Sequence, residues 1–225
     1  MTEQITALVT GANRGLGRQF AAELLSRGAK VYAGARRPES VDLPGAIPLQ
    51  LDITDPESVR RAAEIANDLT VLVNNAGVST QSDLLTGSID DIRIEMETHY
   101  FGTLNVIRQF VPVLEKNGGG SVLNVLSVLA WYHAPAFGAY AAAKAAGWAM
   151  TDALRTELAP KGIHVSALHV GFMDTDMASF VPAEQKINPA VVAKLAITGV
   201  LDGQPEILAD DLSRQVKAGL ATANS

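Results

Sequence analysis

Apolar residues along the chain gather in short runs, and amphipathic segments of helical period separate them. The runs predict strands over residues 5–10, 29–35, 46–52, 69–77, 121–127 and 163–171, with 205–209 as a candidate seventh. The periodic segments predict helices over residues 18–28, 55–68, 89–116 with an interruption near Gly102, 137–158, 188–201 and 211–220. Strands that alternate with helices predict a doubly wound α/β fold with a mostly parallel sheet and helices on both faces.

Small and polar residues stand where these predicted strands end. They are Gly11, Arg36, Asp52, Asn74, Ser127 and Gly171. Because open parallel sheets bind ligands at the carboxyl ends of their strands, we expect these residues to surround one site.

A glycine turn, Gly11-Ala-Asn-Arg-Gly-Leu-Gly17, joins the first predicted strand to the first predicted helix. It departs from the G-x-G-x-x-G fingerprint of many dinucleotide enzymes because its loop is longer. The chemistry is the same: glycines let the backbone approach a pyrophosphate, and the helix N-terminus offers free N–H groups. The turn therefore predicts a nucleotide site.

The end of the second predicted strand indicates which nicotinamide cofactor is preferred. A carboxylate there would bind a ribose 2′-hydroxyl and suit NAD, but the chain has Arg36 and Arg37, and Arg14 lies in the glycine turn. Guanidinium groups grip a 2′-phosphate, so we expect NADP(H), with NAD(H) also accepted. The alternative is that the two arginines form a solvated turn. Asp52 would accept a hydrogen bond from the adenine amino group, or simply begin a turn.

Ser127, Tyr140 and Lys144 are the candidate catalytic residues. Tyr140 and Lys144 are four positions apart in an alanine-rich helical segment, so they share a face. An ammonium beside a phenol lowers the phenol's pKa and favours proton transfer near neutral pH. Ser127 is placed to hold the same substrate oxygen. The alternative is structural, because such Tyr/Lys pairs are common on helices and serine often forms turns.

Bulk properties set limits on the function. A length of 225 residues suits one domain, and a net charge of −6 argues against a nucleic-acid partner. The sequence contains no cysteine, and its four histidines form no metal-binding motif, so no metal is predicted. The N-terminus lacks the pattern of a secretory signal, and no apolar run is long enough to span a membrane. We expect a soluble, cytoplasmic protein.

These motifs together resemble the short-chain dehydrogenase/reductase family over nearly the full length. The matching residues are Thr10 to Gly17, Asp52, Asn74 to Gly77, Ser127, Tyr140 and Lys144, in the family's order and spacing. The resemblance implies one Rossmann-type domain over residues 1–225, with about seven strands and a short substrate loop near 173–190. It also implies hydride transfer between NAD(P)H and a carbonyl or alcohol.

The resemblance assigns roles as well. Tyr140 would be the acid/base, Ser127 would position the oxygen, and Lys144 would bind the nicotinamide ribose and depress the Tyr140 pKa. The implied cofactor contacts are Gly11, Asn13, Arg14, Gly15, Leu16, Arg36, Asp52, Ile53, Asn74, Ala76, Gly77, Tyr140, Lys144, Val170, Phe172 and Thr175. Asn75 is expected to brace the sheet.

Two positions depart from the family pattern. His99 is a fourth candidate catalytic residue, because it stands where the family usually has an asparagine that helps to hold a water linking the lysine to solvent. An imidazole also donates and accepts hydrogen bonds, so His99 serves the same relay, weakens turnover or fills space. Val170 replaces the proline of the family's Pro-Gly pair, and a backbone contact with the cofactor could survive that change.

The substrate is expected to be an apolar ketone or aldehyde, or the matching secondary alcohol, as in carbonyl reductases. The expected pocket residues are Leu129, Trp131, Tyr132, His133, Phe137 and the segment after Met177. The short segment 178–188 predicts an open pocket. Two alternatives are a non-catalytic NADP(H)-binding sensor and a sugar-nucleotide epimerase, although the tail after Gly171 is short for the latter. Relatives suggest a homodimer or homotetramer, while the unusual C-terminal segment leaves a monomer open.

Overall fold

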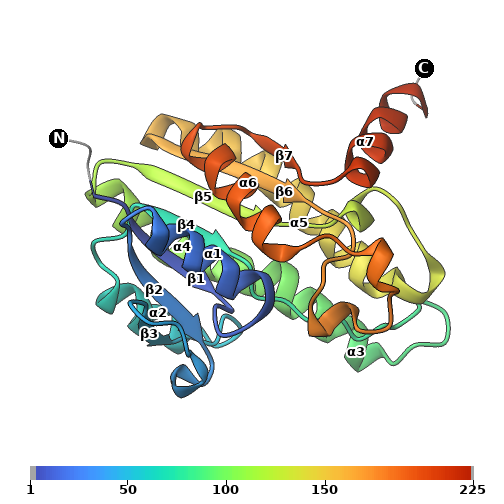
Figure 1. The fold of residues 1–225 in the computed structure, drawn as a ribbon, viewed down its shortest axis with the longest axis horizontal. Helices are drawn as coiled ribbons and strands as arrows, with labels where there is room; N and C mark the ends of the chain where they lie inside the picture. The colour runs from blue at the N-terminus through green and yellow to red at the C-terminus, as the bar shows by residue number, and fades with distance from the viewer. Residues whose placement is uncertain (1–3, 224–225) are drawn as a thin grey trace.

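The strands form one parallel sheet (Figure 1). The structure is a computed structural model, and it describes residues 4–223. Within those residues the sheet has seven strands: β1 (Thr6–Thr10), β2 (Lys30–Ala35), β3 (Ile47–Gln50), β4 (Val71–Asn74), β5 (Gly120–Val125), β6 (Ile163–His169) and β7 (Glu206–Leu208). Their order is β3-β2-β1-β4-β5-β6-β7. The prediction of a doubly wound parallel sheet of about seven strands is confirmed.

Helices cover both faces of the sheet (Figure 1). They are α1 (Gly15–Ser26), α2 (Pro56–Ile65), α3 (Ile89–Met96), α4 (Thr103–Lys116), α5 (Gly138–Leu158), α6 (Pro189–Leu201) and α7 (Asp211–Ala223). One apolar core joins α1 and α6 to the sheet, and a second joins α2, α4 and α5 to its other face. The central strands are apolar on both faces because both are covered; all of β1 is buried.

Side-chain caps fix where several helices begin. Asp55 Oδ1 accepts the Glu57 N–H at 3.0 Å, and Pro56 occupies the first helical position of α2, as predicted. Asn188 caps α6 in the same way, through the Ala190 N–H at 2.8 Å. Such caps satisfy donors that would otherwise have no partner at the start of the helix.

The sheet order reverses between β1 and β4, since the chain moves outward through β2 and β3 and then returns. That reversal opens a crevice at the carboxyl ends of β1 and β4, where doubly wound folds bind ligands. Several predicted strands run too far: β4 ends at Asn74 and β6 at His169, not at residues 77 and 171. The extra residues leave the ladder and form the loops of the crevice.

The predicted helix over 89–116 continues through its interruption. Residues Glu97–Gly102 form a π-helical segment between α3 and α4, so the chain stays helical but gains a local bulge. Such bulges often occur at functional sites because they re-aim nearby side chains. Within residues 4–223, no helix combines the length and apolarity needed to cross a membrane.

Candidate active site

The glycine turn between β1 and α1 has a shape that other residues would not easily adopt. Gly11 and Gly15 have φ angles of 66° and 53°, in the left-handed region that favours glycine. A Cβ on Gly17 would lie 2.2 Å from Gly11 O, too close for any side chain. The turn therefore presents bare backbone at the start of α1, and this fits the binding of a pyrophosphate.

Contacts from the end of β4 brace this turn. Thr10 Oγ1 accepts the N–H groups of Asn75 and Ala76 at 2.9 and 3.0 Å. Asn75 Nδ2 donates to Thr10 O at 2.9 Å and to Gly11 O at 3.3 Å. The predicted bracing role of Asn75 is confirmed.

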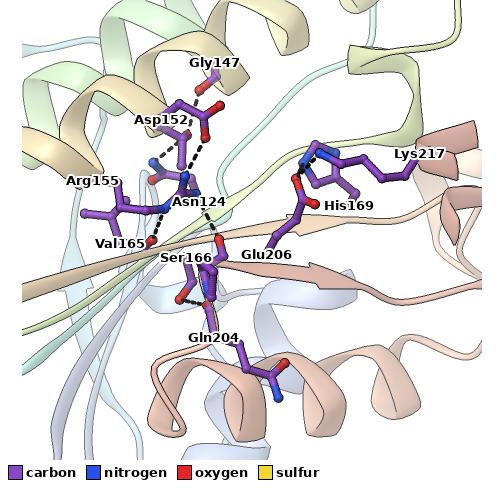
Figure 2. Close-up of polar contacts among 12 residues, drawn as sticks. Asn124, Gly147, Asp152, Arg155, Val165, Ser166, His169, Gln204, Glu206 and Lys217 are labelled. Atoms are coloured by element: carbon purple, nitrogen blue, oxygen red, sulfur yellow. Dashed lines mark hydrogen bonds and ion pairs between the residues drawn. The ribbon is translucent and has the colours of Figure 1, made fainter. Parts of the chain in front are cut away.

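Asn74, which is predicted to line the cofactor, directs its side-chain amide into the sheet. The residue is buried, and Nδ2 donates to Asn124 Oδ1 on β5 at 2.9 Å. Asn124 Nδ2 in turn donates to Thr151 Oγ1 of α5 at 3.0 Å, within the polar network that Figure 2 draws around Asn124. The Asn74 side chain thus ties β4 to β5, because a buried amide needs a partner inside the sheet.

Arginines are exposed at the end of β2, as the cofactor prediction requires. Arg36 and Arg37 both present their side chains to solvent. Arg14, also exposed, forms an ion pair with Asp176 at 3.4 Å, which links the glycine turn to segment 173–190. Thr175 of that segment also lies against the turn, with Cγ2 3.4 Å from a Cβ placed on Gly15. The crevice thus meets its expected substrate loop at this point.

Three other predicted cofactor residues use their side chains in contacts within the chain. Asp52 Oδ1 accepts from Thr54 N and Oγ1 at 3.0 and 2.7 Å, so Asp52 does begin a turn, the alternative that the sequence left open. Ile53 and Leu16 are buried in the two apolar cores.

Ser127 stands two residues beyond the end of β5 and is buried. Its Oγ accepts the Leu129 N–H at 3.1 Å and lies 3.4 Å from Val170 O, to which the hydroxyl donates. Val170 O also accepts the Val128 N–H at 3.1 Å, so the residue that replaces the family's proline holds the serine loop. The Val170 carbonyl oxygen thus holds the serine loop although residue 170 is not proline.

Tyr140 and Lys144 meet on the first turns of α5, as the spacing predicted. Lys144 Nζ lies 5.5 Å from the centre of the Tyr140 ring and donates to Val125 O at 2.8 Å. The Ser127 side chain lies close enough to the Tyr140 phenol to lower its pKa. The structure therefore brings Ser127, Tyr140 and Lys144 together from β5 and α5.

The electrostatics of this trio depend on burial. Burial raises the pKa of the Tyr140 phenol, the Glu95 charge raises it further, and the nearby Ser127 side chain only partly opposes them. Burial lowers the pKa of Lys144 to about 8, against the opposing effect of Glu95. The Tyr140 pKa is thus raised in this structure because burial dominates, and the role of Lys144 in depressing that pKa stays a prediction. A protonated phenol nevertheless suits a proton donor.

His99 joins the trio from the π-helical segment. Its ring meets the Tyr140 ring edge-on with centroids 5.1 Å apart, and it packs against Gly77, where an added Cβ would lie 2.7 Å from His99 Cε1. Burial and the Lys144 charge lower the His99 pKa despite the nearby Glu95, so the ring is neutral at physiological pH. The structure thus places His99 in the site.

Glu95 is a site residue that sequence reasoning missed. Its side chain is fully buried four positions before His99, and Thr80 N–H donates to Oε1 at 2.6 Å. A carboxylate among apolar helix residues was the available signal, but nothing in the periodicity distinguishes it from a solvated acid.

A second cluster lies beside the Ser127 backbone, and Figure 2 shows its members His169, Glu206 and Lys217. His169 of β6 lies with Nδ1 3.2 Å from Ser127 O and stacks on Trp131 at 3.6 Å between centroids. Lys217 of α7 pairs with Glu206 of β7 at 2.8 Å, and its Nζ lies 4.7 Å from the Trp131 ring centre. This cluster fastens α7 to the sheet edge beside the serine loop.

Leu129 and Trp131, which are expected to line the substrate pocket, lie beneath the loop. Both are buried, because their apolar side chains pack beneath the loop. Tyr132 and His133 of the same loop are exposed. Aromatic surface comes from Phe137 and Phe180, both within the expected pocket, and from Phe172, with ring centroids 5.8 to 6.3 Å apart.

The fold and this arrangement define a class: Rossmann-type oxidoreductases that use a nicotinamide dinucleotide. A family model described as short chain dehydrogenase matches residues 5–186, and the chain belongs to the short-chain dehydrogenase/reductase family.

Curated relatives agree with this assignment. The 3-oxoacyl-[acyl-carrier-protein] reductase FabG of Thermotoga maritima is 31% identical over 90% of this chain and 86% of its own. The uncharacterized oxidoreductase YbbO of Escherichia coli K12 is 34% identical over 86% of this chain and 77% of its own.

Solved structures are also similar. A short chain dehydrogenase from Burkholderia cenocepacia in complex with NADP has a TM-score of 0.93 and 40% identity, covering 97% of this chain and 93% of that one. The 3-ketoacyl-(acyl-carrier-protein) reductase from Brucella melitensis complexed with NADH has a TM-score of 0.82 and 26% identity, covering 91% and 94%.

Proposed function

We propose that this protein is an NADP(H)-dependent reductase that interconverts an apolar ketone or aldehyde and the corresponding alcohol. Residues 1–225 would act as one dinucleotide-binding domain, with 173–190 as the substrate loop. The convergence of Ser127, Tyr140 and Lys144 beside the glycine turn is the observation that carries the proposal.

The preference for NADP(H) is supported by charge at the end of β2. That end carries exposed Arg36 and Arg37 and no carboxylate, so it suits a 2′-phosphate better than a ribose hydroxyl. The similar Burkholderia cenocepacia enzyme was solved with NADP. Among the further predicted contacts, Asn13 and the backbone of Leu16 would serve the pyrophosphate. Asp52 Oδ2, which is not part of the turn bonds, would serve the adenine.

In reduction, the bound cofactor supplies hydride to the carbonyl carbon. Ser127 and Tyr140 would hold the carbonyl oxygen, so that charge developing there meets donors already in place. Tyr140, kept protonated by burial, then gives its proton to that oxygen. Lys144 would bind the ribose and lower the cost of forming the phenolate. We propose that His99 replaces the family's asparagine beside them.

The apolar substrate is inferred from the phenylalanines near the site. Phe137, Phe172 and Phe180 contact one another, and Phe180 is 50% exposed. Exposed aromatic surface beside a reactive centre favours an apolar substrate group because its burial releases water. Assembly into a homodimer or homotetramer through α4 and α5, and a cytoplasmic location, stay predictions of the sequence.

A panel of ketones and aldehydes tests the function, with NADPH oxidation followed at the nicotinamide absorbance. We expect turnover to rise with the apolar size of the carbonyl substrate. Tight NADPH binding without turnover of any carbonyl or alcohol would instead favour the non-catalytic sensor.

Removing Arg36 should change cofactor choice. In Arg36→Ala, we expect Kd for NADPH to rise roughly tenfold or more, since a charge-assisted contact is lost, while Kd for NADH barely changes. Titration by protein fluorescence measures both constants. Arg93→Ala, at an exposed arginine of α3, is the control. Equal losses for both cofactors would refute the assignment of the β2 end.

Shortening Phe180 should affect large substrates selectively. We expect Phe180→Ala to raise KM severalfold for aryl ketones and to leave KM for acetone-sized ketones unchanged, because only the former reach the aromatic surface. Phe101→Ala is a matched control, since Phe101 is also 50% exposed but lies in the π-helical segment. A uniform change across substrates would contradict the proposed pocket.

A further inference from the structure

A fully buried carboxylate, Glu95, lies behind the candidate catalytic residues. Its Oε1 accepts two hydrogen bonds from Thr80, from N at 2.6 Å and from Oγ1 at 2.9 Å. Among the described residues its Oε2 has no hydrogen bond of good geometry, and His99 Nε2 lies 3.2 Å away. Buried charges are costly unless they serve a partner, so this arrangement needs an explanation.

The contacts of His99 determine where its ring carries hydrogen. Nε2 faces Val78 O at 2.9 Å and Glu95 Oε2 at 3.2 Å. Both neighbours are acceptors, so Nε2 must be the protonated nitrogen. In the neutral ring Nδ1 is then left as the atom that can accept a hydrogen bond or a proton.

The charged and titratable groups around this pair come from α5. Tyr140 meets the His99 ring edge-on, and Lys144 interacts electrostatically with both His99 and Glu95. Burial raises the pKa of the Glu95 carboxyl, but the His99 ring 3.2 Å away and the hydrogen bonds from Thr80 outweigh it and hold that pKa below its usual value. Glu95 is therefore a fixed negative charge beside a buried ammonium.

We propose that Glu95 is a positioning residue that fixes His99 in its Nε2–H form and so leaves Nδ1 as the acceptor next to Tyr140 and Lys144. Only the expected effect of this positioning on turnover rests on the proposed reductase function. The tautomer itself is a property of the folded chain.

Glutamine at position 95 is the informative change because it keeps the shape. Thr80 needs an acceptor, so the amide oxygen would take the place of Oε1, and the amide N–H₂ would face His99 Nε2. Two donors would then oppose each other, which favours the other tautomer and deprives Val78 O of its partner. Glu97→Gln makes the same change of charge at an exposed position two residues away and is the control.

Nuclear magnetic resonance of protein labelled with ¹⁵N-histidine tests the tautomer without turnover. The His99→Asn variant identifies the signals of His99 among those of the four histidines. We expect neutral His99 protonated at Nε2 in the wild type and in Glu97→Gln, and a mixture or the Nδ1–H form in Glu95→Gln. An Nδ1–H form in the wild type, or no change in Glu95→Gln, would overturn the proposal.

A double-mutant cycle tests whether Glu95 acts through His99. We expect Glu95→Gln to lower kcat roughly tenfold in the wild type and less than about twofold in the His99→Asn background. Loss of the Glu95 charge should also move the Tyr140-dependent rise of alcohol oxidation to lower pH, because that charge raises the Tyr140 pKa. Equal losses in both backgrounds, with an unmoved pH profile, would mean that Glu95 is only structural.

Thr80→Val provides the same test if Glu95→Gln does not fold. It removes the hydroxyl donor to Oε1 and keeps the N–H, so it should loosen Glu95 mildly. We expect the histidine signals and kcat to change in the same direction but less. An unchanged tautomer and unchanged kcat would count against the proposal.

Discussion

Tyr140→Phe should abolish carbonyl reduction while leaving NADPH binding intact. The substitution removes only the phenolic hydroxyl, the group that we propose donates the proton. Proton donation by a positioned side chain contributes about 10² to 10⁴ in rate, so kcat should fall by at least two orders of magnitude. The ring stays to pack against His99, which should preserve the fold.

Single-turnover kinetics and NADPH titration measure the two halves of this expectation. Tyr132→Phe is a matched control because Tyr132 is 56% exposed in the neighbouring loop. It should behave like the wild type. Near-normal turnover in Tyr140→Phe would remove Tyr140 from the mechanism.

Lys144→Met should raise the free energy of unfolding and lower the turnover. Burial lowers the Lys144 pKa from 10.5 to about 8, so the buried ammonium opposes folding by about 3 kcal/mol at neutral pH. Methionine removes that cost but also the hydrogen bond to Val125 O, whose loss costs about 1 to 3 kcal/mol. We therefore expect a net gain of about 1 kcal/mol at pH 7, together with a large loss of turnover.

The sign of the pH dependence follows from the lowered pKa. Below pH 8 both the folded and the unfolded chain hold the Lys144 proton, and the cost is fully present. As the pH rises from about 8 towards 10.5, the unfolded chain binds more protons, and the wild type regains stability. Denaturant unfolding at several pH values should thus show an advantage of Lys144→Met that shrinks above pH 8. A variant less stable than the wild type at every pH would contradict the account.

The parts of the site that sequence could predict depend on local patterns. In the glycine turn, Gly11 and Gly15 have left-handed φ angles and Gly17 lies too close to Gly11 O for a side chain. Only glycine meets these requirements easily, so the sequence itself reveals the turn. Tyr140 and Lys144 share a helical face, and helical spacing alone places them together. Alternating strands and helices likewise predicted a doubly wound, mostly parallel sheet.

The parts that sequence missed depend on burial, which local patterns do not determine. Glu95 resembles any acid on a helix until the fold encloses it behind Thr80. Trp131 looked like a pocket residue, yet His169 and Lys217 from distant segments cover it. The raised pKa of Tyr140 has the same origin, because the fold encloses the phenol.

Transfer of deuterium tests the central claim most directly. NADPH carrying deuterium at both C4 positions would be incubated with the wild type and a prochiral ketone that it reduces, and the alcohol examined by proton resonance and mass spectrometry. Direct hydride transfer beside Tyr140 predicts a single deuterium on the carbinol carbon and only one enantiomer of the alcohol. An alcohol without deuterium, or no alcohol from any carbonyl despite bound NADPH, would contradict the assignment of this site as a reductase.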